Sequence, residues 1–254
     1  MRLGKGRAKP NQRGENMGII YEPKGAAKEY APLAANPYQS CSHGCKYCYV
    51  PPTLKRDREV YYNELLLKKN WLSDFEKDAV KLNGNGKEIL LSFVGDPYQP
   101  VEMELGITRR CIEILMEHDL RFTILTKGGT RAIKDFDLLE SYEKARFGST
   151  IVFASQNDAD QWEPGAAPIA DRVLAIEEAH KRGIKTWVSL EPVIDPDQAL
   201  RLIRELHPVV DHWKIGKLNY KKLPVDWIKF REELRALCEL LGADYYLKTS
   251  LTRL

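Results

Sequence analysis

The 254-residue sequence has few cysteines, little net charge and no long apolar run. No apolar stretch approaches the about 18 residues that a membrane-spanning helix needs, so we expect no membrane span. The N-terminus is basic but has no apolar core, so we expect no secretory signal. Five cysteines, three of them clustered, do not resemble a disulfide framework. This favours a reduced, cytoplasmic setting.

The net charge of +3 is too small to indicate a nucleic-acid partner by itself. Its distribution says more, because residues 1–13 carry five basic side chains and no acidic one. We expect residues 1–17 to form a basic, flexible arm, either solvated or in contact with phosphates, since such contacts need only positive charge and reach. With 43% hydrophobic and 30% charged residues, the composition is ordinary for a globular protein, and we expect residues 18–254 to form one domain.

Strand and helix patterns alternate along most of the chain. Strands are predicted over 88–94, 121–126, 149–155, 186–190, 212–215 and 245–247, with one more just before Cys41. Helices are predicted over 59–82, 107–118, 132–144, 171–182, 196–206 and 226–241. This alternation indicates a parallel sheet with crossover helices, short of a closed eightfold barrel. We therefore predict an α/β fold, a partial (β/α)6-type TIM barrel with the cysteine loop after its first strand.

Three cysteines, Cys41, Cys45 and Cys48, lie in a Cys-x3-Cys-x2-Cys spacing. Their thiolates can converge on one metal centre and leave a coordination position open. One interpretation is an iron–sulfur cluster with three protein ligands. Another is structural zinc with His43 as the fourth ligand. We favour the cluster, because His43 is cramped between two of the cysteines and no second Cys-x2-Cys pair follows.

The cysteine motif, with an aromatic residue at position 47, resembles the signature of the radical S-adenosylmethionine (radical SAM) superfamily. Two further strings, Asn-Pro-Tyr at 36–38 and Gly-Asp-Pro-Tyr-Gln-Pro at 95–100, are similar to the spore photoproduct lyase-like branch, which is related to DNA-repair photolyases. Thr126-Lys127, and Glu-Pro-Gly-Ala at 163–166 with Arg172, also resemble that branch.

The resemblance implies a 4Fe-4S cluster held by Cys41, Cys45 and Cys48, with S-adenosylmethionine on the fourth iron. It implies reductive cleavage to a 5′-deoxyadenosyl radical, which abstracts hydrogen from a substrate related to DNA, RNA or a nucleotide. It also implies an electron donor such as flavodoxin or ferredoxin. The lyase uses a cysteine after its second strand, whereas residues 92–95 contain none. Spore photoproduct repair itself is therefore not expected.

Polar residues follow the predicted strands, and we expect them at the rim where parallel strands end. The residues expected to bind S-adenosylmethionine are Tyr47, Gly95, Asp96, Lys127, Ser155 and Glu191. Lys127 suits the methionine carboxylate, and Gly95 permits close backbone approach. Asp96 either accepts a bond from the cofactor or only fixes the turn before Pro97. Glu191 lies in an apolar strand end and needs a partner, either ribose hydroxyls or a rim lysine.

The remaining candidates lie around the same rim. Tyr49 is the catalytic candidate, on the substrate side of the cysteine loop. Lys214, Lys217 and Lys248 either contact a substrate phosphate or are solvated. The isolated Cys111 and Cys238 lie in apolar helical patterns and are predicted to be core residues. One alternative stays open at this point, a zinc-stabilised nucleic-acid-binding module without catalysis.

Overall fold

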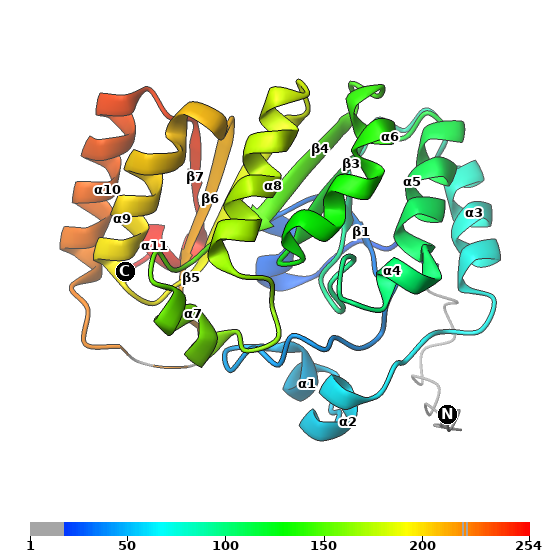
Figure 1. Cartoon of the computed structure of the whole chain (residues 1–254), viewed down its shortest axis with the longest axis horizontal. Helices are drawn as coiled ribbons and strands as arrows, with labels where there is room; N and C mark the ends of the chain where they lie inside the picture. The colour runs from blue at the N-terminus through cyan, green and yellow to red at the C-terminus, as the bar shows by residue number, and fades with distance from the viewer. Residues whose placement is uncertain (1–17, 220, 222) are drawn as a thin grey trace.

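Seven parallel strands form one sheet, each hydrogen-bonded to the next along the chain in the order β1 to β7. The computed structural model describes residues 18–219, 221 and 223–254, so the basic arm predicted for residues 1–17 lies outside the described residues. The strands are β1 Leu33–Ala35, β2 Ile89–Leu91, β3 Phe122–Thr126, β4 Ala145–Thr150, β5 Lys185–Val193, β6 His212–Lys217 and β7 Tyr245–Leu247. The sheet curls into a half-barrel (Figure 1), which confirms the predicted partial TIM barrel.

Helices connect the strands and cover the outer face of the sheet (Figure 1). The α-helices are α1 Val50–Thr53, α2 Arg58–Asn63, α3 Trp71–Leu82, α4 Glu102–Leu105, α5 Ile107–Glu117, α6 Phe136–Glu140, α7 Gln156–Trp162, α8 Ile169–Lys181, α9 Pro196–Leu206, α10 Trp227–Leu241 and α11 Thr249–Thr252. Three 3-10 helices are η1 Gly25–Glu29, η2 Gly129–Asp135 and η3 His207–Val209. The short helices α1, α2 and α7 lie along the lower edge in Figure 1, where the strands end.

The core lies between the sheet and the outer helices. Every residue of β1 and β2 is buried, as expected for strands covered on both faces. The long helices α5, α9 and α10 bury one apolar face each, and Asp195 and Asp226 cap the first turns of α9 and α10. Cys111 and Cys238 are fully buried in this core, which confirms their predicted role. In the described part of the chain, no helix is long and apolar enough to cross a membrane.

The helix predicted over 59–82 is wrong in its middle, because it divides into α2 and α3. Between the two helices, the Leu66 N–H donates to Ser40 Oγ at 2.9 Å and the Leu66 carbonyl accepts from Gln39 N–H at 3.0 Å. These bonds tie the segment to the chain that leads into the cysteine loop, so a long-range contact overrides the local helical spacing.

The strand predicted over 149–155 is also wrong, because β4 lies earlier, at Ala145–Thr150. Arg146 interrupts the apolar pattern, but its Nε donates to Glu88 Oε1 at 2.8 Å. Gly148 has no side chain to mark it as a strand residue, and a Cβ there would overlap the ring of Trp187. Because β4 starts earlier, the helix predicted over 132–144 is reduced to the end of η2 and to α6.

Candidate active site

A cavity of about 400 Å³ opens at the carboxyl ends of the strands. It is lined by nine of the ten predicted site residues, which are Cys41, Cys45, Tyr47, Cys48, Tyr49, Gly95, Asp96, Lys127 and Glu191. Ser155 does not line it. Its side chain caps α7 by accepting from Asp158 N–H at 3.4 Å, and Thr150, which ends β4, lines the cavity instead.

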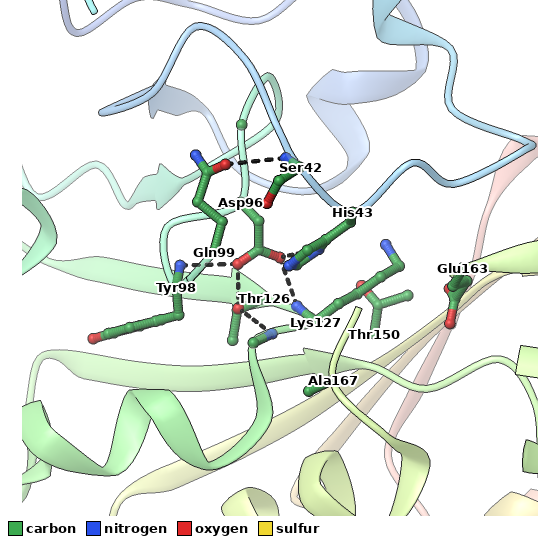
Figure 2. Close-up of polar contacts among 12 residues, drawn as sticks. Ser42, His43, Asp96, Tyr98, Gln99, Thr126, Lys127, Thr150, Glu163 and Ala167 are labelled. Atoms are coloured by element: carbon green, nitrogen blue, oxygen red, sulfur yellow. Dashed lines mark hydrogen bonds and ion pairs between the residues drawn. The ribbon is translucent and has the colours of Figure 1, made fainter. Parts of the chain in front are cut away.

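The side-chain amide of Gln99 holds the backbone of the cysteine loop in place. Gln99 Oε1 accepts from Ser42 N–H, and Gln99 Nε2 donates to the Ser40 carbonyl, both at 3.1 Å (Figure 2 shows the first of these bonds). Gly95 packs so closely against the same segment that a Cβ there would collide with the Ser40 carbonyl oxygen. The close backbone approach predicted for Gly95 therefore exists, and in this structure its partner is the chain leading into Cys41.

Asp96 lies at the centre of a hydrogen-bond cluster (Figure 2). Its Oδ1 accepts from Tyr98 N–H at 2.9 Å and from Thr126 Oγ1 at 2.5 Å. Its Oδ2 accepts from Lys127 N–H at 2.7 Å and lies 3.5 Å from His43 Nδ1. Burial lowers the pKa of His43 to about 4 despite the attraction of Asp96, so the imidazole is neutral at pH 7. Both carboxylate oxygens are occupied within the chain, which favours the turn-fixing role predicted for Asp96.

A buried ion pair supports the other flank of the cysteine loop. Arg172 Nη1 lies 2.5 Å from Glu163 Oε2, and neither side chain is more than 1% exposed. The hydroxyl of Tyr47 donates to the second oxygen of Glu163. Two residues further on, Gly165 N–H donates to the His43 carbonyl at 2.8 Å. The sequence matched this segment to a family pattern, but only the structure shows that it docks the cysteine loop.

Lys127 follows β3 and reaches across the cavity wall. Its Nζ lies 5.5 Å from the ring centroid of Tyr47, and it forms no ion pair with a carboxylate of the described residues. Burial opposes its charge, but the attraction of Cys45 and Glu163 outweighs burial and raises the pKa of Lys127 overall. The site therefore contains a cation whose charge is not matched by a directly bonded acid.

Among the three clustered cysteines, Cys45 is buried and Cys41 and Cys48 are partly exposed. Burial raises the pKa of Cys41 to about 12 and raises that of Cys45 as well. As the described side chains are placed, no group of three or more His, Cys, Asp or Glu residues could hold a single metal ion.

The opposite wall of the cavity is built around Glu191. The hydroxyl of Tyr30 and the Lys248 ammonium, the latter at 2.6 Å, both donate to Glu191 Oε2. The rim lysine predicted as one possible partner for Glu191 is therefore present. Sequence reasoning missed Tyr30, which also bonds Ser189 Oγ at 3.0 Å, because no motif or periodic pattern surrounds it.

Of the three lysines predicted either to contact a substrate phosphate or to be solvated, Lys214 and Lys248 are buried, so the solvated alternative is wrong for these two. Lys248 is 3% exposed and pairs with Glu191. Lys214 is 8% exposed and donates to the backbone carbonyls of Glu29 and Tyr30. Lys217 is half-buried, with its Nζ 5.8 Å from the ring centroid of Trp227.

Comparisons with known proteins give one family match and a shared fold. Residues 35–207 match the family model described as the radical SAM superfamily. An uncharacterised protein of Methanocaldococcus jannaschii is 28% identical over 193 residues, which cover 75% of this chain and 72% of that protein. Among solved structures, spore photoproduct lyase complexed with dinucleoside spore photoproduct has a TM-score of 0.71 at 17% identity, covering 89% of this chain and 80% of the lyase. A lyase variant with bound AdoMet and dinucleoside spore photoproduct has a TM-score of 0.70 at 17% identity, covering 88% of this chain and 78% of that chain.

Proposed function

The chain belongs to the radical SAM superfamily, and from this premise we propose that Cys41, Cys45 and Cys48 hold a 4Fe-4S cluster beside S-adenosylmethionine. Membership of an enzyme superfamily decides against the non-catalytic zinc module. The observation that carries the proposal is that the three thiols of one loop line one cavity, whose described lining contains no fourth cysteine. Thiolates of a cluster bind different irons, so they need not converge on a single ion. When bound, the cluster and S-adenosylmethionine together would supply a 5′-deoxyadenosyl radical by reductive cleavage of S-adenosylmethionine.

The chain's own residues orient the cofactor and exclude water. Lys127 binds the methionine carboxylate, because its ammonium group lines the cavity without a directly bonded acid. Tyr47 and Gly95 bound the space beside the cysteine loop. Glu191, already neutralised in part by Lys248, offers an acceptor to ribose hydroxyls. Tyr49 borders the substrate side, and Asp96 acts through the turn it fixes.

We further propose a substrate related to nucleic acid, and flavodoxin or ferredoxin as electron donor. Support for the substrate class comes from the lyase, which binds a dinucleoside spore photoproduct on a similar fold. Spore photoproduct repair itself is not part of the proposal, because the Ser92–Gly95 segment contains no cysteine.

The test begins with anaerobic purification and reconstitution with iron and sulfide. We expect four irons per chain in the form of the cluster, a paramagnetic signal after reduction, and formation of 5′-deoxyadenosine from S-adenosylmethionine and dithionite. Changing Cys41, Cys45 or Cys48 to Ala is expected to abolish both the signal and the product. Zinc without iron, or a reconstituted cluster that never yields 5′-deoxyadenosine, would contradict the proposal.

Two variants serve as comparisons. Cys238→Ala removes a thiol from the core, away from the cavity, and is expected to retain iron and activity. Lys127→Met is expected to retain iron but to weaken binding of S-adenosylmethionine by about 10-fold or more, as for loss of a charge-assisted contact. Unchanged affinity in Lys127→Met would remove the carboxylate role from this lysine.

A further inference from the structure

A groove of about 770 Å³ runs along the outer side of the cysteine loop. Its walls come from the loop with α1, from the start of α2, from the end of α7 and from the segment after β6. Three of these elements, α1, α2 and α7, lie along one edge of the molecule (Figure 1). The groove is therefore assembled from four separate parts of the chain, which the fold brings together beside the cavity.

The groove is basic. Its lining contains Lys46, Arg58 and Lys221 and no aspartate or glutamate. None of the three forms an ion pair with a carboxylate in the part of the chain that the structure describes. Arg58 instead donates to the hydroxyl of Tyr62 at 3.1 Å, and all three side chains are exposed. Positive charge that is not neutralised internally suits a polyanion.

Aromatic rings lie among these charges. Trp162 lines the groove, and the Lys221 ammonium lies 5.3 Å from its ring centroid. Tyr49 also lines the groove and is 42% exposed. Basic groups that follow a phosphate backbone, combined with aromatic rings on which bases stack, are typical of surfaces that bind single-stranded nucleic acid.

The groove and the cavity share part of their walls. Six residues line both, and they are Tyr47, Cys48, Tyr49, Thr53, Leu218 and Asn219. A chain lying in the groove therefore passes directly by the opening of the cavity. An enzyme that acts on a nucleotide inside such a cavity needs that nucleotide out of the base stack.

We propose that this groove binds a single-stranded nucleic-acid segment, with its phosphates on Lys46, Arg58 and Lys221 and its bases against Trp162 and Tyr49, and presents one nucleotide to the cavity. The inference rests on the proposed function, because it takes the cavity as the reaction site. It adds the strandedness of the substrate and the surface that holds it.

The test uses the reconstituted full-length protein and a fluorescein-labelled oligothymidylate, with binding followed by anisotropy between about 50 and 200 mM salt. The double variant Arg58→Gln/Lys221→Gln is expected to bind about 10-fold or more weakly at the lower salt. Its log–log salt slope is expected to fall by about 1.4, since each lost single-strand phosphate contact removes about 0.7. Lys181→Gln, at the far end of α8, is the matched control and is expected to change neither quantity.

Further ligands separate the alternatives. An abasic oligomer of equal charge is expected to bind about 10-fold more weakly than oligothymidylate, because it cannot stack. Oligouridylate, tested in parallel, decides between DNA and RNA as the source of the strand. A wild-type salt slope in the double variant, an equal loss in Lys181→Gln, or abasic binding as tight as oligothymidylate would each overturn the proposal.

A separate measurement isolates this inference from the proposed function. Formation of 5′-deoxyadenosine without substrate is measured in the wild type, independently of oligonucleotide binding. If the wild type forms none, the proposed chemistry fails while the binding result stands by itself. If 5′-deoxyadenosine forms but oligothymidylate binding does not depend on Arg58 and Lys221, the proposed binding groove is overturned and the proposed chemistry is supported.

Discussion

The family match covers one part of the cavity wall and leaves another part outside. Inside residues 35–207 are the cysteine loop, Asp96, Lys127 and the Glu163–Arg172 pair. Outside are residues 21–31, which we call the bridging segment, and the strands β6 and β7. Both parts line or support the cavity, but different kinds of contact hold them.

On the side of the cysteine loop, side chains satisfy backbone groups of the loop, as Gln99 does for Ser40 and Ser42. The bridging segment instead joins the two open edges of the half-barrel. Tyr21 pairs with Ala34 of β1 at one edge, and Glu29 accepts from Thr249 N–H at 2.7 Å beyond β7 at the other. The comparison indicates that one wall fixes the cysteine loop, whereas the other closes the space above the sheet.

The largest expected effect lies on the cysteine-loop side. Arg172→Met leaves the buried Glu163 carboxylate with only the Tyr47 hydroxyl among its side-chain partners. Removing one member of a buried ion pair typically costs about 3–5 kcal/mol. We expect a loss of that size in the free energy of unfolding, measured in guanidinium chloride, and a fall in iron content after reconstitution, because the docking of the loop depends on Glu163.

The matched control is an exposed pair on α10. Lys229 Nζ lies 3.6 Å from Glu233 Oε1, and the lysine side chain is 70% exposed. Lys229→Met is expected to change the free energy of unfolding by less than about 1 kcal/mol and to leave the iron content unchanged. Full iron content in Arg172→Met would show that this pair does not support the loop.

The sequence predicted the cysteine-loop side well where the signal was local. The spacing of Cys41, Cys45 and Cys48 and the residue types at the ends of β2 and β3 identified eight residues that line that wall, but not its other lining residues, such as Tyr61, Phe93 and Leu125. Ser155 was chosen in place of Thr150 because the apolar stretch that precedes Ser155 continues past the end of β4. Which part of an apolar stretch pairs as a strand depends on the neighbouring strands, and a single sequence does not contain that information.

The bridging side could hardly be predicted. Tyr30 meets Ser189 and Glu191 across about 160 residues of chain, and Glu29 meets Thr249 across 220. Nothing periodic marks these residues, since they lie in a short segment of small and polar residues around η1. The argument that Glu191 needs a partner did point to a rim lysine, because a carboxylate in an apolar strand is costly unless it is paired.

A smaller effect is expected on the bridging side. The Glu29 carboxylate accepts from Thr249 N–H and Oγ1, each at 2.7 Å, and from the Tyr246 hydroxyl at 3.2 Å. Glu29→Gln replaces charged acceptors and is expected to cost about 1.5–3 kcal/mol of the free energy of unfolding. Amide hydrogen exchange of residues 25–30 should be faster, while iron content stays unchanged.

Glu22→Gln is the control within the same segment. Glu22 pairs with Lys87 at 3.3 Å, and both side chains are at least half exposed, so an effect below about 0.5 kcal/mol is expected. Loss of iron in Glu29→Gln would contradict the separate roles of the two walls, because it would show that the bridging segment also supports the cysteine loop.

The smallest effect concerns the pH dependence of stability at Lys214. Burial, followed by repulsion from Arg146, lowers the pKa of Lys214 to about 8 from its ordinary value of 10.5, with Glu88, Lys248 and Glu29 as its other charged neighbours. Between these two values the unfolded chain binds more protons than the folded chain, so this lysine makes stability rise with pH above about 8.

Lys214→Met lacks that contribution. The difference in the free energy of unfolding, wild type minus variant, is expected to increase on the order of 1 kcal/mol from pH about 8 to about 10. Tyrosine ionisation near pH 10 affects both proteins and cancels in this difference. A difference that is flat or falls with pH would show that Lys214 keeps its proton in the folded protein, held by the carbonyls of Glu29 and Tyr30.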